Sequence, residues 1–445
     1  MIAWRRLVGG GAVCLAVVAV VPVTAQQVAG AQGLSASILS VYTPPACVPG
    51  VPFADVTCTT GFDPWIEQLA LDGITAGCGN GNYCPGTPVT RDQMAVFLEK
   101  AMRGTSNWPP HTVLAFHHPA AEANSDVNSG TELLGLVAAI PSTGSEAPSA
   151  TNPWLIKVGP GVFDLGSGSL TLPAYTVLEG AGQDITVITA AAPAGGSLGT
   201  VVPGDHDRLS RLTVDSVGGS STGLAVHLPP TATNVGLEHL ALVASGSSGS
   251  LNGALCLGAE SGASFSMVDC DLTAHGAQNN KGVLAWASTG ECRLDSVRIN
   301  VYGGTDQDWA VSLFDTPLVV TNSRFDVSDG SDQRGINAVG GSLAVRDSEI
   351  HVQGLGYGIL TLDLPVTLLG DVITTPGWGV HLVGTGAAEI DHCDVEGGSV
   401  SIWVSLSYVA TVGASKLVGA TASIGATLNC FGNYTNSAFL PNTCP

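Results

Sequence analysis

The hexapeptide Asp347-Ser348-Glu349-Ile350-His351-Val352 is one copy of a short motif that recurs through the second half of the chain. Other copies begin at Asp269-Cys270, Asp295-Ser296, Asn322-Ser323, His392-Cys393 and Ala414-Ser415. From one Ser or Cys to the next, the copies are 26, 27, 25, 45 and 22 residues apart. The step of 45 contains two turns, with a degenerate middle copy at Leu369-Gly370-Asp371-Val372. A repeat of 22–27 residues indicates a solenoid.

Side chains within the motif alternate between two faces of a strand. Ser348, Ile350 and Val352 share one face, and the acidic and histidine side chains share the other. The Ser or Cys is therefore predicted to lie inside the stack, and the Asp outside it at the start of each strand. In the copy at Asp295-Ser296, one extra residue precedes the next apolar position, Ile299. The motif is expected to index where each strand begins, which leaves the longer turns for function.

Short strands separated by Gly or Pro turns run from about Trp154 to Asn429. The Leu-x-x-Leu-x-Leu frame of leucine-rich repeats is absent, and no helix-period segment interrupts the repeats. The pattern resembles right-handed parallel β-helix proteins of the pectin-lyase-like superfamily. The predicted fold class is mainly β: a right-handed parallel β-helix over 151–429, with roughly 12 coils about 4.8 Å apart, and a small N-terminal α-helical module.

The N-terminal sequence indicates an exported protein. Residues 1–25 are typical of a signal peptide, because Arg5 and Arg6 precede the apolar run Leu7–Val21 and a small-residue site at Val23-Thr24-Ala25. A retained membrane anchor is the alternative. The net charge of −21 repels nucleic acid and anionic lipid, and also polyanionic sugars unless a divalent cation bridges them. We expect a secreted or cell-surface bacterial protein with no membrane span in the mature chain.

Eleven cysteines are present, one of them (Cys14) inside the predicted signal peptide. An even number of remaining cysteines in an exported chain favours disulfides. The predicted pairs are Cys78 with Cys84, Cys430 with Cys444, and Cys47 with Cys58. For the cysteines in strand-like runs, burial as small apolar residues is as good an interpretation as pairing; these are Cys256, Cys270, Cys292 and Cys393.

After a predicted flexible leader (26–50), residues 51–104 have a different character. Asp63 is a suitable N-cap before a helix that carries Trp65, Ile66 and Leu69 on one face. Thr90-Arg91-Asp92-Gln93 forms a capping box, and Met94, Phe97, Leu98 and Ala101 follow at helical spacing.

Residues 51–104 resemble one S-layer homology module. The segments that carry the resemblance are Phe53-x-Asp55-Val56, Trp65-Ile66, Gly73-Ile74-Thr75 and Val89–Ala95. The resemblance implies a helix–loop–helix fold that binds cell-wall glycans, with Thr90, Arg91 and Trp65 as binding residues. Two features depart from the family: Asp92-Gln93 replaces Ala-Glu, and one module is present where the family has three. The alternative is a disulfide-pinned helical cap in which Arg91 pairs with an acid.

The remaining segments are predicted to connect and close the solenoid. Residues 105–130 contain His111, His117 and His118 without matching metal-ligand spacing and are predicted to be a linker. Residues 131–150 are predicted as an N-terminal cap helix, opened by the capping box Ser129-Gly130-Thr131-Glu132. Residues 430–445 are predicted as a disulfide-tied C-terminal cap.

Local signatures of β-helix enzymes are absent: no Gly-His-Gly, no Asp-Phe-x-Phe-Gly and no Trp-x-Asp-His occurs. The catalytic candidates are Asp205, His206, Asp207 and Arg208, which combine an acid or base with an anion partner; the alternative is a polar turn. No metal or cofactor is predicted. The alternative is a Ca²⁺ site at Asp326, Asp329 and Asp332, with Asp306 and Asp308 one coil earlier, although such aspartates also suit turns.

Two further groups of residues are candidates. Arg298, Arg324 and Arg346, from consecutive coils, are interpreted either as a solvated charge ladder or as a source of a lyase base. Aromatic platforms for sugar rings are offered by Trp286, Trp309, Trp378 and Trp403.

We therefore predict an exported cell-surface protein that contacts cell-wall or extracellular polysaccharide, without a demonstrable catalytic site. The first alternative is a carbohydrate-active enzyme, a polysaccharide lyase or glycoside hydrolase, working in a groove along the β-helix. The second is a structural adhesin or stalk. Convergence of acidic, Arg or His side chains from adjacent coils would favour the enzyme.

Overall fold

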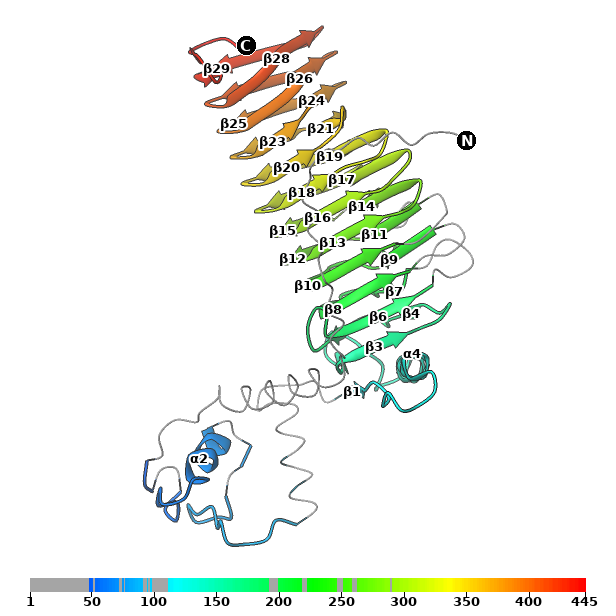
Figure 1. Ribbon diagram of the computed structural model, residues 1–445, viewed down its shortest axis with the longest axis vertical. Coiled ribbons are helices and arrows are strands. Elements are labelled where there is room, and N and C mark those ends of the chain that lie inside the picture. Colours follow the sequence, from blue (N-terminus) through cyan, green and yellow to red (C-terminus); the bar gives the residue numbers. More distant parts are fainter. Residues whose placement is uncertain are drawn as a thin grey trace, which may run out of the picture. The chain divides into compact units, whose positions relative to one another are not determined.

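The computed structural model describes residues 48–50, 53–71, 74–75, 77–90, 94, 97, 111–191, 199–217, 222–245, 251–257, 262–288 and 290–445. The predicted signal peptide and most of the predicted leader, together with Cys47 and Arg91, lie outside these residues. The chain divides into two compact units, Met1–Asn107 and Trp108–Pro445, shown as ribbons in Figure 1.

The first unit contains helix α2 (Asp63–Leu71) and a small core of Phe53, Val56 and Ile66. The first hydrogen bonds of α2 are accepted by the Phe62 carbonyl, so the N-cap of the helix is Phe62, one residue before the predicted Asp63. The Asp63 carboxylate instead accepts hydrogen bonds from the amide and hydroxyl of Thr60. Cys78 and Cys84 form the predicted disulfide, and Cys58 is disulfide-bonded. The second helix expected from Thr90 falls mostly outside the described residues.

The second unit is a parallel β-helix whose strands stack in three sheets (Figure 1). Sheet 1 consists of β1 (His111–Ala115), β2 (Trp154–Val158), β5 (Thr176–Glu179), the first parts of β8 (Arg208–Ser216) and β10 (Val235–Ala244), β12 (Phe265–Val268), β15 (Cys292–Asp295), the second parts of β17 (Gln307–Thr321) and β19 (Asp332–Arg346), β22 (Val366–Leu369), β25 (Ala387–Asp391), β27 (Val409–Gly413) and β29 (Thr427–Phe431).

Sheet 2 consists of β3 (Gly161–Asp164), β6 (Thr186–Ala190), the second parts of β8 and β10, β13 (Asp271–His275), β16 (Arg298–Tyr302), β18 (Arg324–Val327), β20 (Glu349–Val352), β23 (Val372–Thr375), the first parts of β26 (Asp394–Ser405) and β28 (Lys416–Ile424), and β30 (Asn433–Tyr434).

Sheet 3 has eleven members among the described residues, one for each complete coil: β4 (Leu170–Thr171), β7 (Val201–Val202), β9 (Thr222–Leu228), β11 (Leu251–Leu257), β14 (Asn279–Trp286), the first parts of β17 and β19, β21 (Tyr357–Leu362), β24 (Trp378–Val383), and the second parts of β26 and β28. The predicted fold class is confirmed: mainly β, a right-handed parallel β-helix.

One continuous apolar core fills the inside of the coils, with Phe163, Phe325 and Tyr408 among its largest fully buried side chains. The alternation read from the motif is confirmed, because Ser348, Ile350 and Val352 are buried. Stacking like residues over like residues in successive coils removes their apolar surface from water, which is the main favourable contribution to folding.

The recurring motif forms the corner between sheets 1 and 2. Its first residue has a left-handed backbone, with φ between 44° and 54° in the copies at Asp269, Asn322, Asp347, His392 and Ala414. Asp and Asn tolerate this conformation better than most residues do. The next residue points inward and links coils: the Ser323 amide donates to Ser348 Oγ at 3.1 Å, and the Ser348 amide to Asp371 Oδ1 at 3.0 Å.

The alignment of one copy is corrected. Ser296, expected inside, itself takes the left-handed corner position with φ 57°. Val297 then occupies the inward place, and its amide donates to Ser323 Oγ at 3.1 Å. With Ser296 at the corner, this coil has the same spacing to its next apolar residue, Ile299, as the other copies have. The sequence was misaligned by one residue because both Asp295 and Ser296 are compatible with the corner.

The segment predicted to be a linker contains strand β1, which pairs in parallel with β2 from His111 to Ala115. Helix α4 spans Ser125–Ala138 and therefore begins before the predicted capping box. Ser129 and Gly130 lie buried within the helix, where a Cβ on Gly130 would come within 1.9 Å of the Asp164 carbonyl oxygen. This close packing on β3 explains the glycine. Leu133 and Val137 join the core, as expected of a cap.

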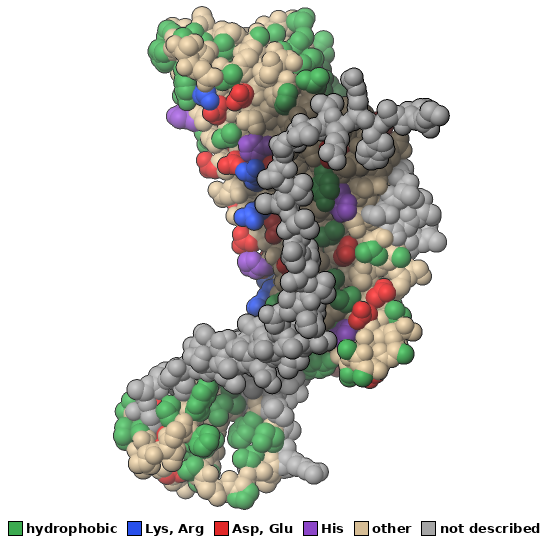
Figure 2. Space-filling view, viewed as in Figure 1, with side chains coloured by type: hydrophobic (Ala, Val, Ile, Leu, Met, Phe, Trp, Pro, Cys, Tyr) green, Lys and Arg blue, Asp and Glu red, His purple; other side chains and the backbone are tan. Residues whose placement is uncertain are grey.

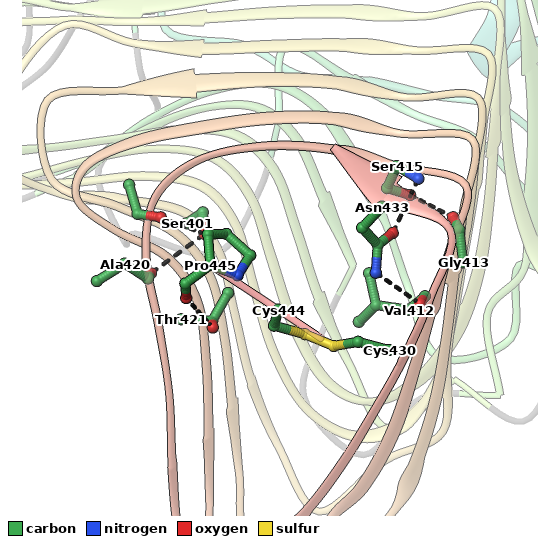
Figure 3. Close-up of a disulfide and its surroundings, with 11 residues drawn as sticks. Ser401, Val412, Gly413, Ser415, Ala420, Thr421, Cys430, Asn433, Cys444 and Pro445 are labelled. Carbon is green, nitrogen blue, oxygen red and sulfur yellow. Dashed lines mark hydrogen bonds between the residues drawn. A yellow bond between two sulfur atoms is a disulfide. The ribbon is translucent and has the colours of Figure 1, made fainter. Parts of the chain in front are cut away.

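At the other end, β31 (Phe439–Leu440) pairs antiparallel with β30, and the Cys430–Cys444 disulfide is present as predicted (Figure 3). Thr421 donates its amide and hydroxyl hydrogens to the Pro445 carbonyl, at 2.9 and 2.5 Å. Asn433 continues the corner ladder by accepting the Ser415 amide at 3.0 Å. The four cysteines left open by the sequence, at Cys256, Cys270, Cys292 and Cys393, are buried and free. No helix in the described residues has the length and hydropathy of a membrane span.

Candidate functional site

The four consecutive catalytic candidates do not converge. Asp207 is buried and accepts the amides of Thr176 and Gly204 at 2.7 and 2.6 Å. Burial raises the pKa of Asp207 to about 7. Arg208 points out of sheet 1 and pairs with Glu238 at 2.6 Å.

Asp205 and His206 lie at the surface next to them. Asp205 binds His206 Nδ1 at 2.8 Å and accepts bonds from Thr233. The His206 ring stacks on Tyr175 with ring centres 4.9 Å apart. Asp207 therefore stabilises a turn. Asp205, His206 and Arg208 lie at the surface and do not point toward a common point where a substrate atom could react.

The calcium candidates also have separate partners. Asp326 binds Arg324 at 2.8 Å, Asp329 accepts the Gly303 amide at 3.1 Å, and Asp332 binds Arg334 at 2.7 Å. Among the residues that the structure describes, no group of three or more His, Cys, Asp or Glu side chains could hold a metal ion.

The three candidate arginines do not form one ladder. Arg298 and Arg324 are direct neighbours in sheet 2, whereas Arg346 belongs to sheet 1. Arg324 is compensated by Asp326 and Glu349, at 2.8 and 2.7 Å. Figure 2 shows Lys, Arg, Asp, Glu and His side chains in a stripe along one edge of the β-helix, so charges of both signs lie together at this surface.

In the first unit, Trp65 projects from α2 with 45% of its surface exposed, and Phe62 is 76% exposed. Thr90 is the last described residue before Arg91. The structure therefore places two of the three predicted glycan-binding residues, and their role stays a prediction.

The tryptophans of the repeats lead to sheet 3. Trp309, Arg334, Tyr357 and Trp378 are successive partners in one row of its outer side. His381 and Trp403 are partners in the adjacent row. We call the four half-buried side chains Tyr357, Trp378, His381 and Trp403 the aromatic face.

The rings of the aromatic face contact one another. Trp378 stacks on Trp403 with ring centres 4.9 Å apart and an interplanar angle of 13°. Tyr357 meets Trp378 edge-on at 5.0 Å, and His381 meets it edge-on at 4.9 Å. These separations match the spacing of neighbouring strands, about 4.8 Å, so the coil repeat itself sets the ring spacing.

His381 completes this surface as a neutral ring. Removal from water lowers its pKa to about 4, because burial disfavours the charged imidazolium. Its Nδ1 atom is buried and has no hydrogen-bond partner among the described residues. The aromatic face is therefore uncharged at neutral pH.

A cationic cluster adjoins the aromatic face on the N-terminal side. Lys281 Nζ lies 3.2 Å from the centre of the Trp309 ring, and the Arg334 guanidinium lies 4.3 Å from it. Arg334 is held by Asp332 and donates to Asn337 Oδ1 at 2.5 Å. Burial lowers the pKa of Lys281 to about 7, while the ring face opposes this by stabilising the ammonium. Lys281 and Trp309 are only 4% and 8% exposed, so this cluster serves as support.

The fourth tryptophan lies apart from the aromatic face. Trp286 packs against a separate apolar cluster of Leu224, Cys256 and Leu284, and meets Phe314 with ring centres 5.9 Å apart. Only two of the four predicted platforms, Trp378 and Trp403, therefore belong to the candidate site.

Tyr357 and His381 were missed from the sequence. A usable signal existed for Tyr357, because Gly356-Tyr357-Gly358 and Gly377-Trp378-Gly379 repeat a Gly–aromatic–Gly triplet, whereas His381 lies outside such a triplet. The structure explains it: a Cβ on Gly358 would lie 2.4 Å from Ile373 Cγ2 and 2.5 Å from the Gly379 oxygen.

No family model matches this chain, and no curated protein matches its sequence. Solved structures with a similar course include ORF18 of Geobacillus virus E2, at 9% identity and a TM-score of 0.43, covering 80% of this chain and 66% of that one. The catalytic unit of the GH87 α-1,3-glucanase of Streptomyces thermodiastaticus has 15% identity and a TM-score of 0.42, with coverages of 75% and 69%. For the A-module of the Azotobacter vinelandii mannuronan C-5 epimerase AlgE4, the values are 11%, 0.36, 70% and 96%. The chain spans about two thirds of the length of the first two structures.

Proposed function

We propose that this chain is an extracellular protein that binds a polysaccharide along the aromatic face of sheet 3 and does not cleave it. The observation that carries the proposal is the set of four half-buried rings on neighbouring coils, Tyr357, Trp378, His381 and Trp403. Sugar rings have apolar faces that lose contact with water when they lie against aromatic side chains. Each Å² of apolar surface removed from water contributes roughly 25 cal/mol to the free energy of binding.

Binding without cleavage is supported by the arrangement of carboxylates. Most glycoside hydrolases use two carboxyl groups that flank one bond. Near the aromatic face, Asp332 is held by Arg334, and Asp363 accepts the amide and hydroxyl hydrogens of Thr385 at 2.7 and 3.0 Å. Each of these carboxylates already has a structural partner.

The proposal extends to location. The signal-like N-terminus and the disulfides Cys78–Cys84 and Cys430–Cys444 support an oxidising, extracellular setting. The first unit, through its resemblance to an S-layer homology module, would attach the β-helix to cell-wall glycan with Thr90, Arg91 and Trp65.

The binding proposal is tested by calorimetric titration of the full-length protein with a panel of soluble polysaccharides. Trp403→Ala is expected to weaken binding at least tenfold, because it removes one wall of the stacked pair. Phe431→Ala is the matched control, since this ring is 54% exposed but lies on sheet 1. Equal losses in both variants, or no loss in Trp403→Ala, would contradict the site. Release of reducing ends from a bound polymer would show cleavage and favour the enzyme.

Attachment is tested separately with full-length protein on purified bacterial cell walls. Arg91→Ala is expected to release most of the protein into the supernatant, while Arg346→Ala, a substitution on sheet 1, leaves retention unchanged. Full retention of Arg91→Ala would remove the anchoring role.

A further inference from the structure

We propose that the aromatic face selects an uncharged polysaccharide, one built of neutral sugars, over polymers that carry carboxylate, sulfate or amine groups. This inference rests on the proposed function above and names the class of glycan that the site takes.

The first observation is the absence of charge along the face. The segments 357–362, 378–383, 400–405 and 420–424, which form the last four strands of sheet 3, contain no Asp, Glu, Lys or Arg. His381 is their only histidine. Their outward side chains are aromatic, aliphatic or small, such as Leu360, Val383 and Ala422.

The second observation is that the same coils carry charge on their other two sides. Sheet 1 has Glu389 and Asp391, and sheet 2 has Glu349, Asp394, Glu396 and Lys416. Because every coil passes through all three sheets, a random distribution of these charges would place some on sheet 3. The chain instead keeps its charges off the aromatic face.

The third observation concerns the borders of the face. Towards the N-terminal end, Arg334 is compensated by two contacts with Asp332, at 2.9 and 2.7 Å. At the corner after β21, the Asp363 carboxylate accepts the amide and hydroxyl hydrogens of Thr385. These neighbouring charges are therefore already engaged.

Such a surface discriminates between glycans by desolvation. A carboxylate or sulfate held against Trp378 and Trp403 would lose water, which is costly. The cation that lies over the Tyr357 ring, Arg334, is already paired with Asp332. The net charge of −21 adds long-range repulsion of polyanions. An amine-bearing polymer would be attracted only by that diffuse charge, and salt screens this attraction. A neutral polymer incurs none of these costs.

The test uses the full-length protein with a neutral glucan, polygalacturonate and chitosan of matched length, titrated at low and high salt. We expect the glucan to bind at least tenfold more tightly than polygalacturonate, with an affinity independent of salt and lost in Trp403→Ala. Chitosan binding should disappear at high salt and be insensitive to Trp403→Ala.

A charge-adding variant sharpens the test. Ala422 is the register partner of Trp403, so Ala422→Lys places a cation at the edge of the face. It is expected to improve polygalacturonate binding roughly threefold, the size of an exposed ion pair, and Ala422→Gln is its uncharged control.

The outcomes separate the two proposals. If polygalacturonate or chitosan binds as tightly as the glucan at high salt and this binding is lost in Trp403→Ala, the site stands and its selectivity for neutral sugars is wrong. If none of the polymers shows binding that depends on Trp403, both proposals fail.

Discussion

Asp371 occupies a position where the preceding coil has Ser348 and the following coil has Cys393. Its carboxylate accepts the amides of Ser348 and Leu369, each at 3.0 Å, inside the corner between sheets 1 and 2. Burial nevertheless raises the pKa of Asp371 to about 7, from an ordinary value of 3.8. The folded protein therefore binds this proton more tightly than the unfolded chain does, and Asp371 adds stability at low pH.

This contribution is fully present below about pH 4 and is lost as pH rises from 3.8 to about 7. Asp371→Ser places a hydroxyl at this corner, as Ser348 and Ser415 do in other coils. Between pH 4 and 8 we expect the free energy of unfolding of this variant to fall less than that of the unchanged protein. Denaturant unfolding across this range measures the slope. The exposed Glu389→Gln is the control; if it flattens the slope as much as Asp371→Ser does, the assignment to Asp371 is wrong.

Gly358 is required by close packing between coils. Its Cβ position lies 2.4 Å from Ile373 Cγ2 and 2.5 Å from the Gly379 oxygen. Gly358→Ala is therefore expected to destabilise the protein by about 1–3 kcal/mol through overpacking, measured by denaturant unfolding. Gly135, in α4, has no atom within 4 Å of its Cβ position, so Gly135→Ala should be neutral or stabilising. A neutral Gly358→Ala would show that the coils can separate.

At this scale the sequence predicted the inward face of the motif but not every assignment within it. Ser296 and Ser348 are the same residue type, yet one occupies the left-handed corner and the other lies inside. Composition does not distinguish these positions, because a serine satisfies both. Of the aromatic face, Trp378 and Trp403 were predicted, whereas Tyr357 and His381 were not. Strand alternation does not reveal which side of sheet 3 a side chain takes when the turns vary in length.

Among the elements, α4 closes the N-terminal end of the core with Leu133, which is fully buried. Leu133→Ala is expected to cost about 2–5 kcal/mol, the range for a large buried aliphatic side chain, measured by denaturant unfolding. Thr131→Ala, at an exposed position of the same helix, is the control. Equal stabilities of the two variants would show that α4 does not contribute to the core.

The C-terminal tail closes the other end through Cys430–Cys444, which are 14 residues apart. Cys430→Ser with Cys444→Ser is expected to lower stability by about 3 kcal/mol, the chain-entropy value for a loop of this length, measured by thermal unfolding. Cys393→Ser is the control, because Ser348 and Ser415 occupy the equivalent inward position in other coils. A loss in Cys393→Ser as large as in the double variant would contradict this account.

The sequence predicted both closing elements but misplaced the start of one. The pattern Ser129-Gly130-Thr131-Glu132 matches a capping box, whereas Asn124 precedes the first turn of the helix with φ 57°. Tertiary packing overrode the local pattern, because Gly130 is needed where α4 contacts β3. Strand β1 was missed because it precedes the repeated segments of the sequence, so no repeat pattern marks it.

For the whole molecule, a net charge of −21 makes the acidic groups of the folded protein repel one another. Added salt screens this repulsion, so the melting temperature at pH 8 should rise between 20 and 300 mM sodium chloride by a few degrees. Near pH 4.5, the isoelectric point of the sequence, the same salt should have little effect. Scanning calorimetry tests both conditions, and an equal rise at both values of pH would point to an effect other than charge screening.

The hydrogen-bonded corner has a consequence for how this protein can change over evolutionary time. Because Asn322, Asp347 and Gly370 occupy equivalent corner positions, excising residues 347–369 would join two compatible ends and shorten the rod by one layer. Gene duplication or deletion in units of one repeat thus alters length without redesigning the interior. The number of aromatic rings that the outer side of sheet 3 carries then changes in steps of one repeat.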